Sequence, residues 1–74
     1  MALRMATEII TLAIDADVNK DYAASHALYQ RALALFHEAL ALEKNPKTKE
    51  IILKRTVGYT ERAGMVKMEL ARKS

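Results

Sequence analysis

The chain has 74 residues, no cysteine, and 12 lysine and arginine residues against 9 aspartate and glutamate residues, for a formal net charge of +3. A chain of this length forms one small core with little interior for a shielded active site, and without cysteine it can hold neither a disulfide nor a thiolate metal site. No apolar run approaches the roughly 20 residues that a membrane crossing requires, so we expect a soluble, intracellular chain.

A first helix is predicted over residues 2–18. Apolar residues recur along it every three or four positions, which is the spacing of a helix with one buried face. This face comprises Leu3, Ala6, Ile9, Ile10, Ala13, Ile14 and Val18. Asp15 and Asp17 lie two positions apart and point in different directions, so we interpret them as a solvated helix end and not as a carboxylate pair. Asp21, in the polar turn that follows, is expected to cap the next helix.

A second helix is predicted over residues 22–43, with two apolar stripes. The first stripe is Tyr22, Ser25, Tyr29, Ala32, Phe36 and Ala39, and the second is Leu28, Leu35 and Leu42. Two stripes separated by small residues indicate that the helix contacts a neighbour on each side, as the middle helix of a three-helix bundle does. Leu33 and Leu40 continue the apolar surface, and we expect them to line a groove.

A third helix is predicted over residues 46–72, because Asn45 is a good cap and Pro46 fits a first helical turn. Its inward stripe is Ile52, Thr56, Tyr59, Ala63, Val66 and Leu70, and a parallel stripe is Leu53, Val57, Thr60, Gly64 and Met68. Short turns make neighbouring helices antiparallel, so the sequence predicts a single all-α domain over residues 1–74, an up-down-up bundle. Its brevity suggests a piece of a larger protein.

Two glycines interrupt the third helix. Gly58 and Gly64 each cost about 1 kcal/mol relative to alanine in a helix interior, so a reason other than helix propensity is needed for them. Either a partner backbone approaches closely along this helix, or a well-packed bundle tolerates the glycines. Both interpretations stay open at this point.

Groups capable of catalysis are sparse. His26 and His37 lie eleven residues apart on one helix, about 16 Å along its axis, which is too far to share one metal ion. No phosphate-binding loop, nucleophile elbow or helical metal motif is present. The spacing of Tyr22, Tyr29 and Tyr59 coincides with the inward stripes, which favours core packing over base stacking. We therefore expect no catalytic activity, no cofactor and no metal ion.

Charge is divided unevenly along the chain. Residues 1–43 carry three basic and six acidic side chains, whereas residues 44–74 carry nine basic and three acidic ones. In a helical bundle this asymmetry indicates complementary helices with solvated lysine and arginine tips. The alternatives are a basic three-helix module that binds nucleic acid and a structural segment that oligomerises.

Two stretches of the sequence carry a family resemblance. The first runs from Asp21-Tyr22 through Tyr29 to Ala32-Leu33 and on to Phe36, Ala39 and Leu40, and the second is Glu43-Lys-Asn-Pro-Lys-Thr-Lys-Glu50. Together with Tyr59-Thr-Glu-Arg62-Ala63, they resemble the microtubule-interacting and trafficking (MIT) domain. The resemblance is strongest to the amino-terminal domains of the vacuolar-protein-sorting AAA ATPases that disassemble ESCRT-III polymers. The tyrosine spacing also resembles half of a tetratricopeptide hairpin, but no second copy follows.

The resemblance implies a non-catalytic three-helix bundle whose grooves bind motifs in the carboxy-terminal tails of ESCRT-III subunits. A helical motif is expected between the second and third helices, at Leu33, His37, Leu40, Lys54, Val57, Thr60, Glu61 and Gly64. An extended, proline-containing motif is expected between the first and third helices, at Ile10 and Ile14. Thr60 stands where the family usually has leucine and Gly64 where it usually has an acidic residue, so we expect weaker binding of the helical motif.

The implied role is that of an adaptor, which would bring an AAA ATPase to ESCRT-III in endosomal sorting, membrane scission or cytokinesis. We expect the domain to be monomeric and cytoplasmic, to reach endosomal or other ESCRT-III-coated membranes only through its partners, and to bind no nucleic acid.

Overall fold

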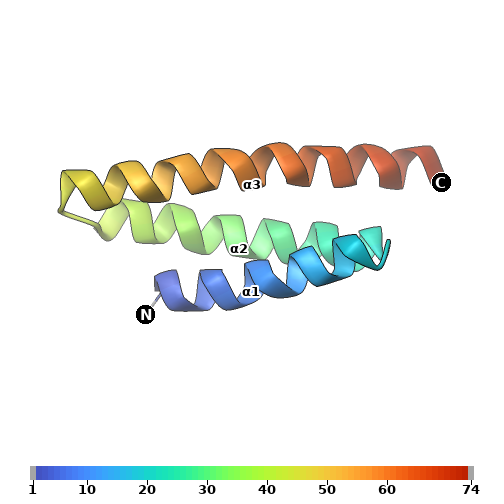
Figure 1. Cartoon of the computed structure of the whole chain (residues 1–74), viewed down its shortest axis with the longest axis horizontal. Helices are drawn as coiled ribbons and strands as arrows, with labels where there is room; N and C mark the ends of the chain where they lie inside the picture. Colours follow the sequence, from blue (N-terminus) through green and yellow to red (C-terminus); the bar gives the residue numbers. More distant parts are fainter. Residues whose placement is uncertain (1, 74) are drawn as a thin grey trace.

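The computed structural model describes the backbone of residues 2–73 and the side chains of residues 4–72. The chain forms three helices, α1 (Ala2–Val18), α2 (Tyr22–Leu42) and α3 (Pro46–Lys73), with no strand in the described part. The molecule is elongated, with principal extents of 42 × 18 × 15 Å. The predicted all-α, up-down-up bundle is confirmed (Figure 1).

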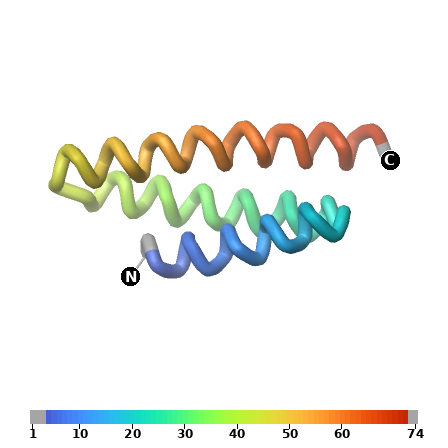
Figure 2. Tube along the Cα trace, in the orientation of Figure 1, coloured from blue at the N-terminus to red at the C-terminus, as the bar shows by residue number. Residues whose placement is uncertain are grey.

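Helices α1 and α3 both pack against the middle helix, α2. In Figure 1, α2 lies between α1 and α3, and these two helices pack mainly on α2 and scarcely on each other. The last part of α3 extends beyond the turn that joins α1 to α2, as the tube in Figure 2 shows. Helix α3 therefore packs on α2, and its described contact with α1 is the ion pair between Asp17 and Arg62.

The helix boundaries follow from the capping residues. The Asp21 carboxylate accepts a hydrogen bond from the Ala24 amide at 3.3 Å, and the Asn45 side chain accepts one from the Lys47 amide at 2.9 Å. Both caps were predicted, because short polar side chains satisfy the unpaired amides of a first helical turn. Helix α2 ends one residue earlier than predicted, since Glu43 is already extended.

The core is small and lies along α2. The buried apolar residues are Ala6, Ile10, Ala13, Tyr29, Ala32, Leu33, Phe36, Ile52, Ala63 and Val66. The ring of Phe36 stacks on that of Tyr59, with centroids 5.5 Å apart, which joins α2 to α3. Buried Ser25 donates a hydrogen bond to the carbonyl of Ala13 at 2.9 Å. Small residues at this contact let α1 and α2 approach closely.

The buried face of α1 differs from the prediction. Ile14 and Val18 were expected on it, but they are 40% and 76% exposed, whereas Asp17 is 8% exposed. The prediction that Asp17 belongs to a solvated helix end was wrong, because this carboxylate is paired within the protein. Leu42, also expected on a buried stripe, is 71% exposed. The side chain of Leu3 lies outside the described residues.

Candidate binding grooves

A first groove lies between α2 and α3, with a volume of about 470 Å³. We call it the α2/α3 groove. Its lining residues are Gln30, Leu33, Ala34, His37, Thr60, Ala63, Gly64 and Lys67. Four of the residues predicted for a helical motif meet here, namely Leu33, His37, Thr60 and Gly64. An apolar floor with polar and basic residues at the rim can bind an amphipathic segment.

The other residues predicted for this groove lie around it. Val57 is half exposed and lies one turn before Thr60 on the same flank of α3. Leu40 is half-buried against the core. Lys54 is exposed and pairs with Glu50 at 3.2 Å, and Glu61 is exposed. None of these four belongs to the lining of the groove.

Two features of α3 set the shape of this groove. The Thr60 hydroxyl donates to the carbonyl of Thr56 at 2.7 Å, so its hydrogen-bonding capacity as a donor is used within the helix. A Cβ atom added at Gly64 would meet nothing within 4 Å. Packing inside the chain therefore does not require this glycine, and the space beside it is open.

A second groove lies between α1 and α3, also with a volume of about 470 Å³. We call it the α1/α3 groove. Its lining residues are Ile14, Asp17, Tyr29, Arg55, Gly58, Tyr59 and Arg62. Of the two residues predicted for this groove, Ile14 lines it, whereas Ile10 is 3% exposed and belongs to the core. Ile10 is therefore absent from the lining and offers the groove no free surface.

An ion pair crosses the end of the α1/α3 groove. Arg62 donates from Nε to Asp17 Oδ2 and from Nη2 to Asp17 Oδ1, the latter at 2.7 Å. The Tyr29 hydroxyl donates to the same Oδ2 at 3.4 Å. The Asp17 side chain is 7% exposed and that of Arg62 48% exposed. Each of the three helices thus contributes one side chain to this cluster.

The cluster favours the charged carboxylate. The hydrogen bonds from Arg62 hold the pKa of Asp17 below its usual value, although burial acts in the opposite direction. The same pairing raises the pKa of Arg62, and burial raises the pKa of Tyr29. Sequence reasoning missed this cluster. The available signal was that Asp17 continues the three-and-four spacing of Ala6, Ile10 and Ala13.

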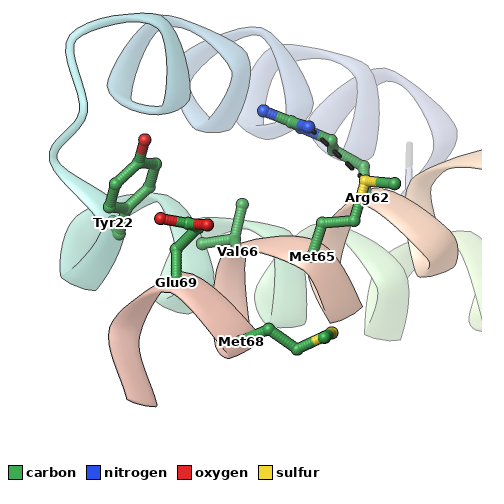
Figure 3. A pocket seen from close by; sticks show the side chains of 6 residues that line it. All are labelled: Tyr22, Arg62, Met65, Val66, Met68 and Glu69. Carbon is green, nitrogen blue, oxygen red and sulfur yellow. Dashed lines mark hydrogen bonds between the residues drawn. The ribbon is translucent and has the colours of Figure 1, made fainter. Parts of the chain in front are cut away.

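A smaller pocket of about 340 Å³ lies on the other side of Arg62, towards the end of α3. We call it the end pocket. Figure 3 shows its lining, with Tyr22 at the start of α2 beside Glu69 of α3, and Met65 joined to Arg62 by a hydrogen bond. The Arg62 Nη1 atom donates to the Met65 sulfur at 3.5 Å. Val66 and Met68 complete the lining.

The grooves offer surfaces for binding and no constellation for metal chemistry. Among residues 4–72, no three histidine, aspartate or glutamate side chains lie together in a way that could hold a metal ion. Within the same range, no helix combines the length and the apolar character that crossing a bilayer demands. His37 lines the α2/α3 groove, whereas the Nε2 atom of His26 is buried without a hydrogen-bond partner among the described residues.

The family of this bundle follows from its similarity to known proteins. A family profile for the MIT (microtubule interacting and transport) domain matches residues 3–68, nearly the whole bundle. The chain belongs to the MIT domain family. The resemblance noted in the stretches around residues 21–40 and 43–50 is thereby confirmed.

This MIT domain is also similar to the vacuolar protein sorting-associated protein 4 of Dictyostelium discoideum, with 37% identity over 65 residues. The matched region covers 88% of the chain and 15% of that relative. The similarity therefore concerns one part of a much longer protein. It supports a protein-interaction domain related to vacuolar protein sorting.

Proposed function

We propose that this MIT domain is an adaptor that binds carboxy-terminal tail motifs of ESCRT-III subunits and so brings an AAA ATPase to them. The observation that carries the proposal is the presence of an open, partly apolar groove on each flank of α3. Family membership and the similarity to a vacuolar sorting protein support the choice of partner. The domain itself would catalyse nothing, and any ATPase activity would belong to another part of the parent protein.

The α2/α3 groove fits a helical motif. Leu33 and Ala63 give it an apolar floor, onto which an amphipathic helix can place one face. The exposed apolar side chains of Leu53 and Val57 extend that surface along α3. Lys67 stands at the rim, where a basic residue favours acidic flanks of a tail, mainly through faster association.

We assign the extended, proline-containing motif to the α1/α3 groove. Ile14 and Tyr59 supply apolar walls, and Gly58 carries no side chain that would fill the space between them. Binding in this groove would leave the core contact of Ile10 intact, because Ile10 is buried and is not part of the groove lining.

The proposed cellular role is recruitment to endosomal sorting, membrane scission or cytokinesis. We propose a monomeric domain in the cytoplasm that reaches ESCRT-III-coated membranes through its partners. Nucleic acid would not be a partner. The charged ends of the basic side chains of α3 would remain in solvent and speed the association with acidic tails.

The test is a fluorescence-polarisation titration of labelled ESCRT-III tail peptides, helical and proline-containing, at two salt concentrations. We expect saturable, roughly micromolar and modestly salt-sensitive binding to at least one class. Thr60→Glu and Ile14→Glu form a matched pair, since each places a charge in one groove at an exposed position. Each should remove binding of one peptide class and spare the other, because the new charge would be desolvated against an apolar peptide.

Thermal melts of both variants control for unfolding. Absence of saturable binding to every tail would overturn the proposal. Steeply salt-dependent binding to any duplex would instead indicate a nucleic-acid module, and association that depends on protein concentration without a response to peptide would indicate an oligomerisation segment.

A further inference from the structure

The two arginines of the α1/α3 groove are not equivalent. Arg55 and Arg62 lie seven positions apart on α3, on the same flank. The guanidinium of Arg62 is bound at two nitrogens by the buried carboxylate of Asp17. Arg55 is exposed, and among residues 4–72 it has no ion-pair partner. The groove therefore contains one paired cation and one that is available.

An open apolar notch lies between these arginines. Gly58 is one turn along α3 from Arg55, and a Cβ atom added there would meet nothing within 4 Å. Ile14 on α1, 40% exposed, and half-buried Tyr59 line the same groove. Packing within the chain does not account for a glycine at this position, so the space above it is free for a side chain from outside.

The charges of the groove favour an anionic ligand group. Its lining holds two arginines and one aspartate, so one positive charge is left after Asp17 and Arg62 have neutralised each other. A guanidinium forms a forked, charge-assisted pair with a carboxylate, and such a pair gains from a partly desolvated setting beside apolar walls.

We propose that the α1/α3 groove selects a peptide segment in which a carboxylate lies next to an apolar side chain. The apolar side chain occupies the notch over Gly58, between Ile14 and Tyr59, and the carboxylate pairs with Arg55. Arg62 is a positioning residue, because Asp17 holds it and it closes one end of the notch. This specificity rests on the proposed function, since it assumes that the groove binds partner peptides.

The experiment compares two versions of one proline-containing tail peptide, with glutamate or with glutamine beside the apolar anchor. We expect the full chain to bind the glutamate peptide about three- to tenfold more tightly, as for other charged pairs at an interface rim. Arg55→Gln should remove that preference and leave the affinity for the glutamine peptide nearly unchanged. Lys49→Gln is the matched control, because it removes one charge from α3 at a position that lines neither groove.

Gly58→Leu tests the notch separately. Leucine is a better helix former than glycine, so the variant should melt at a higher temperature while it binds both peptides at least tenfold more weakly. A loss of binding with a raised melting temperature cannot come from unfolding. Unchanged binding in Gly58→Leu would place the anchor elsewhere and overturn the proposal.

The outcomes separate this inference from the proposed function. Equal affinity of the wild-type chain for both peptides, or equal weakening of both by Arg55→Gln, would overturn the selectivity and leave tail binding in place. No binding of either peptide class would overturn both. Binding of a duplex that falls equally in Arg55→Gln and Lys49→Gln would show a general attraction of phosphates to α3, and it would contradict the proposal that nucleic acid is not a partner.

Discussion

The two grooves share α3 but are held open in different ways. At the α2/α3 groove the helices pack directly through apolar residues, among them Leu33 and Ala63, so side-chain packing sets the groove's width. At the α1/α3 groove the helices scarcely touch, and the pair between Asp17 and Arg62 spans the gap. One flank therefore depends on the apolar core and the other on charge. Perturbations of different kinds should distinguish the two grooves.

The largest effect is expected from a substitution in the core, on which both grooves depend. Phe36 is 2% exposed and stacks on Tyr59, so Phe36→Ala removes a ring from the contact between α2 and α3. Such truncations cost about 3–5 kcal/mol, a large part of the stability of a small domain. Denaturant titration should show this loss, and peptides of both classes should lose binding together. Loss of one class alone, in a folded variant, would contradict the shared core.

A smaller effect, confined to one flank, is expected from Asp17→Asn. This change leaves the half-exposed Arg62 without its charged partner and weakens the contact with Tyr29. We expect destabilisation of about 2 kcal/mol, which lowers the melting temperature of a domain of this size by roughly 10 °C. At temperatures where the variant is still folded, its affinity for the proline-containing peptide should fall more than its affinity for the helical peptide. Asp15→Asn is the control, because Asp15 is exposed.

Low pH should remove the stabilisation by the Asp17 carboxylate in the wild-type chain as well. Because the folded pKa of Asp17 is lowered, its carboxylate stabilises the fold fully above its unfolded pKa of about 3.9, and this contribution is lost as pH falls through the lower folded value. The difference in melting temperature between wild type and Asp17→Asn should thus be constant near neutrality and shrink below about pH 4. A difference that stays constant down to strongly acidic pH would exclude the charge of Asp17 as its cause.

The smallest effect concerns the α2/α3 groove alone. Thr60→Leu replaces a side chain whose hydroxyl bonds only to its own helix with one that presents more apolar surface to the groove. We expect the helical peptide to bind about tenfold more tightly, or ~1.4 kcal/mol. The affinity of the proline-containing peptide serves as the internal control and should not change. An unchanged or weaker affinity for the helical peptide would show that this groove has a different geometry.

The helices and their ends were predictable because they depend on local chemistry. The spacing of apolar residues predicted three helices, and Asp21 and Asn45 marked where two of them begin. The pairing of Asp17 was not predictable in the same way. Its partner is 45 residues away, and helical periodicity carries no information about a charge on another helix.

The assignment of groove residues shows a second limit of periodicity. Ile10 and Ile14 are four residues apart, so on an ideal helix their directions differ by about 40°. That small angle decides which of them is 3% exposed in the core and which is 40% exposed in the groove. The rotation of α1 about its axis sets this outcome, and the burial of Asp17 helps to fix that rotation. The spacing of apolar residues predicted the apolar face of α1, but it could not predict which residue of that face, Ile10 or Ile14, reaches the surface.

The 45-residue separation of Asp17 and Arg62 also bears on how the bundle folds. Contacts between α1 and α2, or between α2 and α3, close short segments and can form early, whereas a pair between the outer helices requires both antiparallel hairpins to be in place. Interactions made after the rate-limiting barrier act on unfolding and leave the folding rate nearly unchanged. We therefore expect this ion pair to govern how long the folded bundle persists, more than how fast it forms.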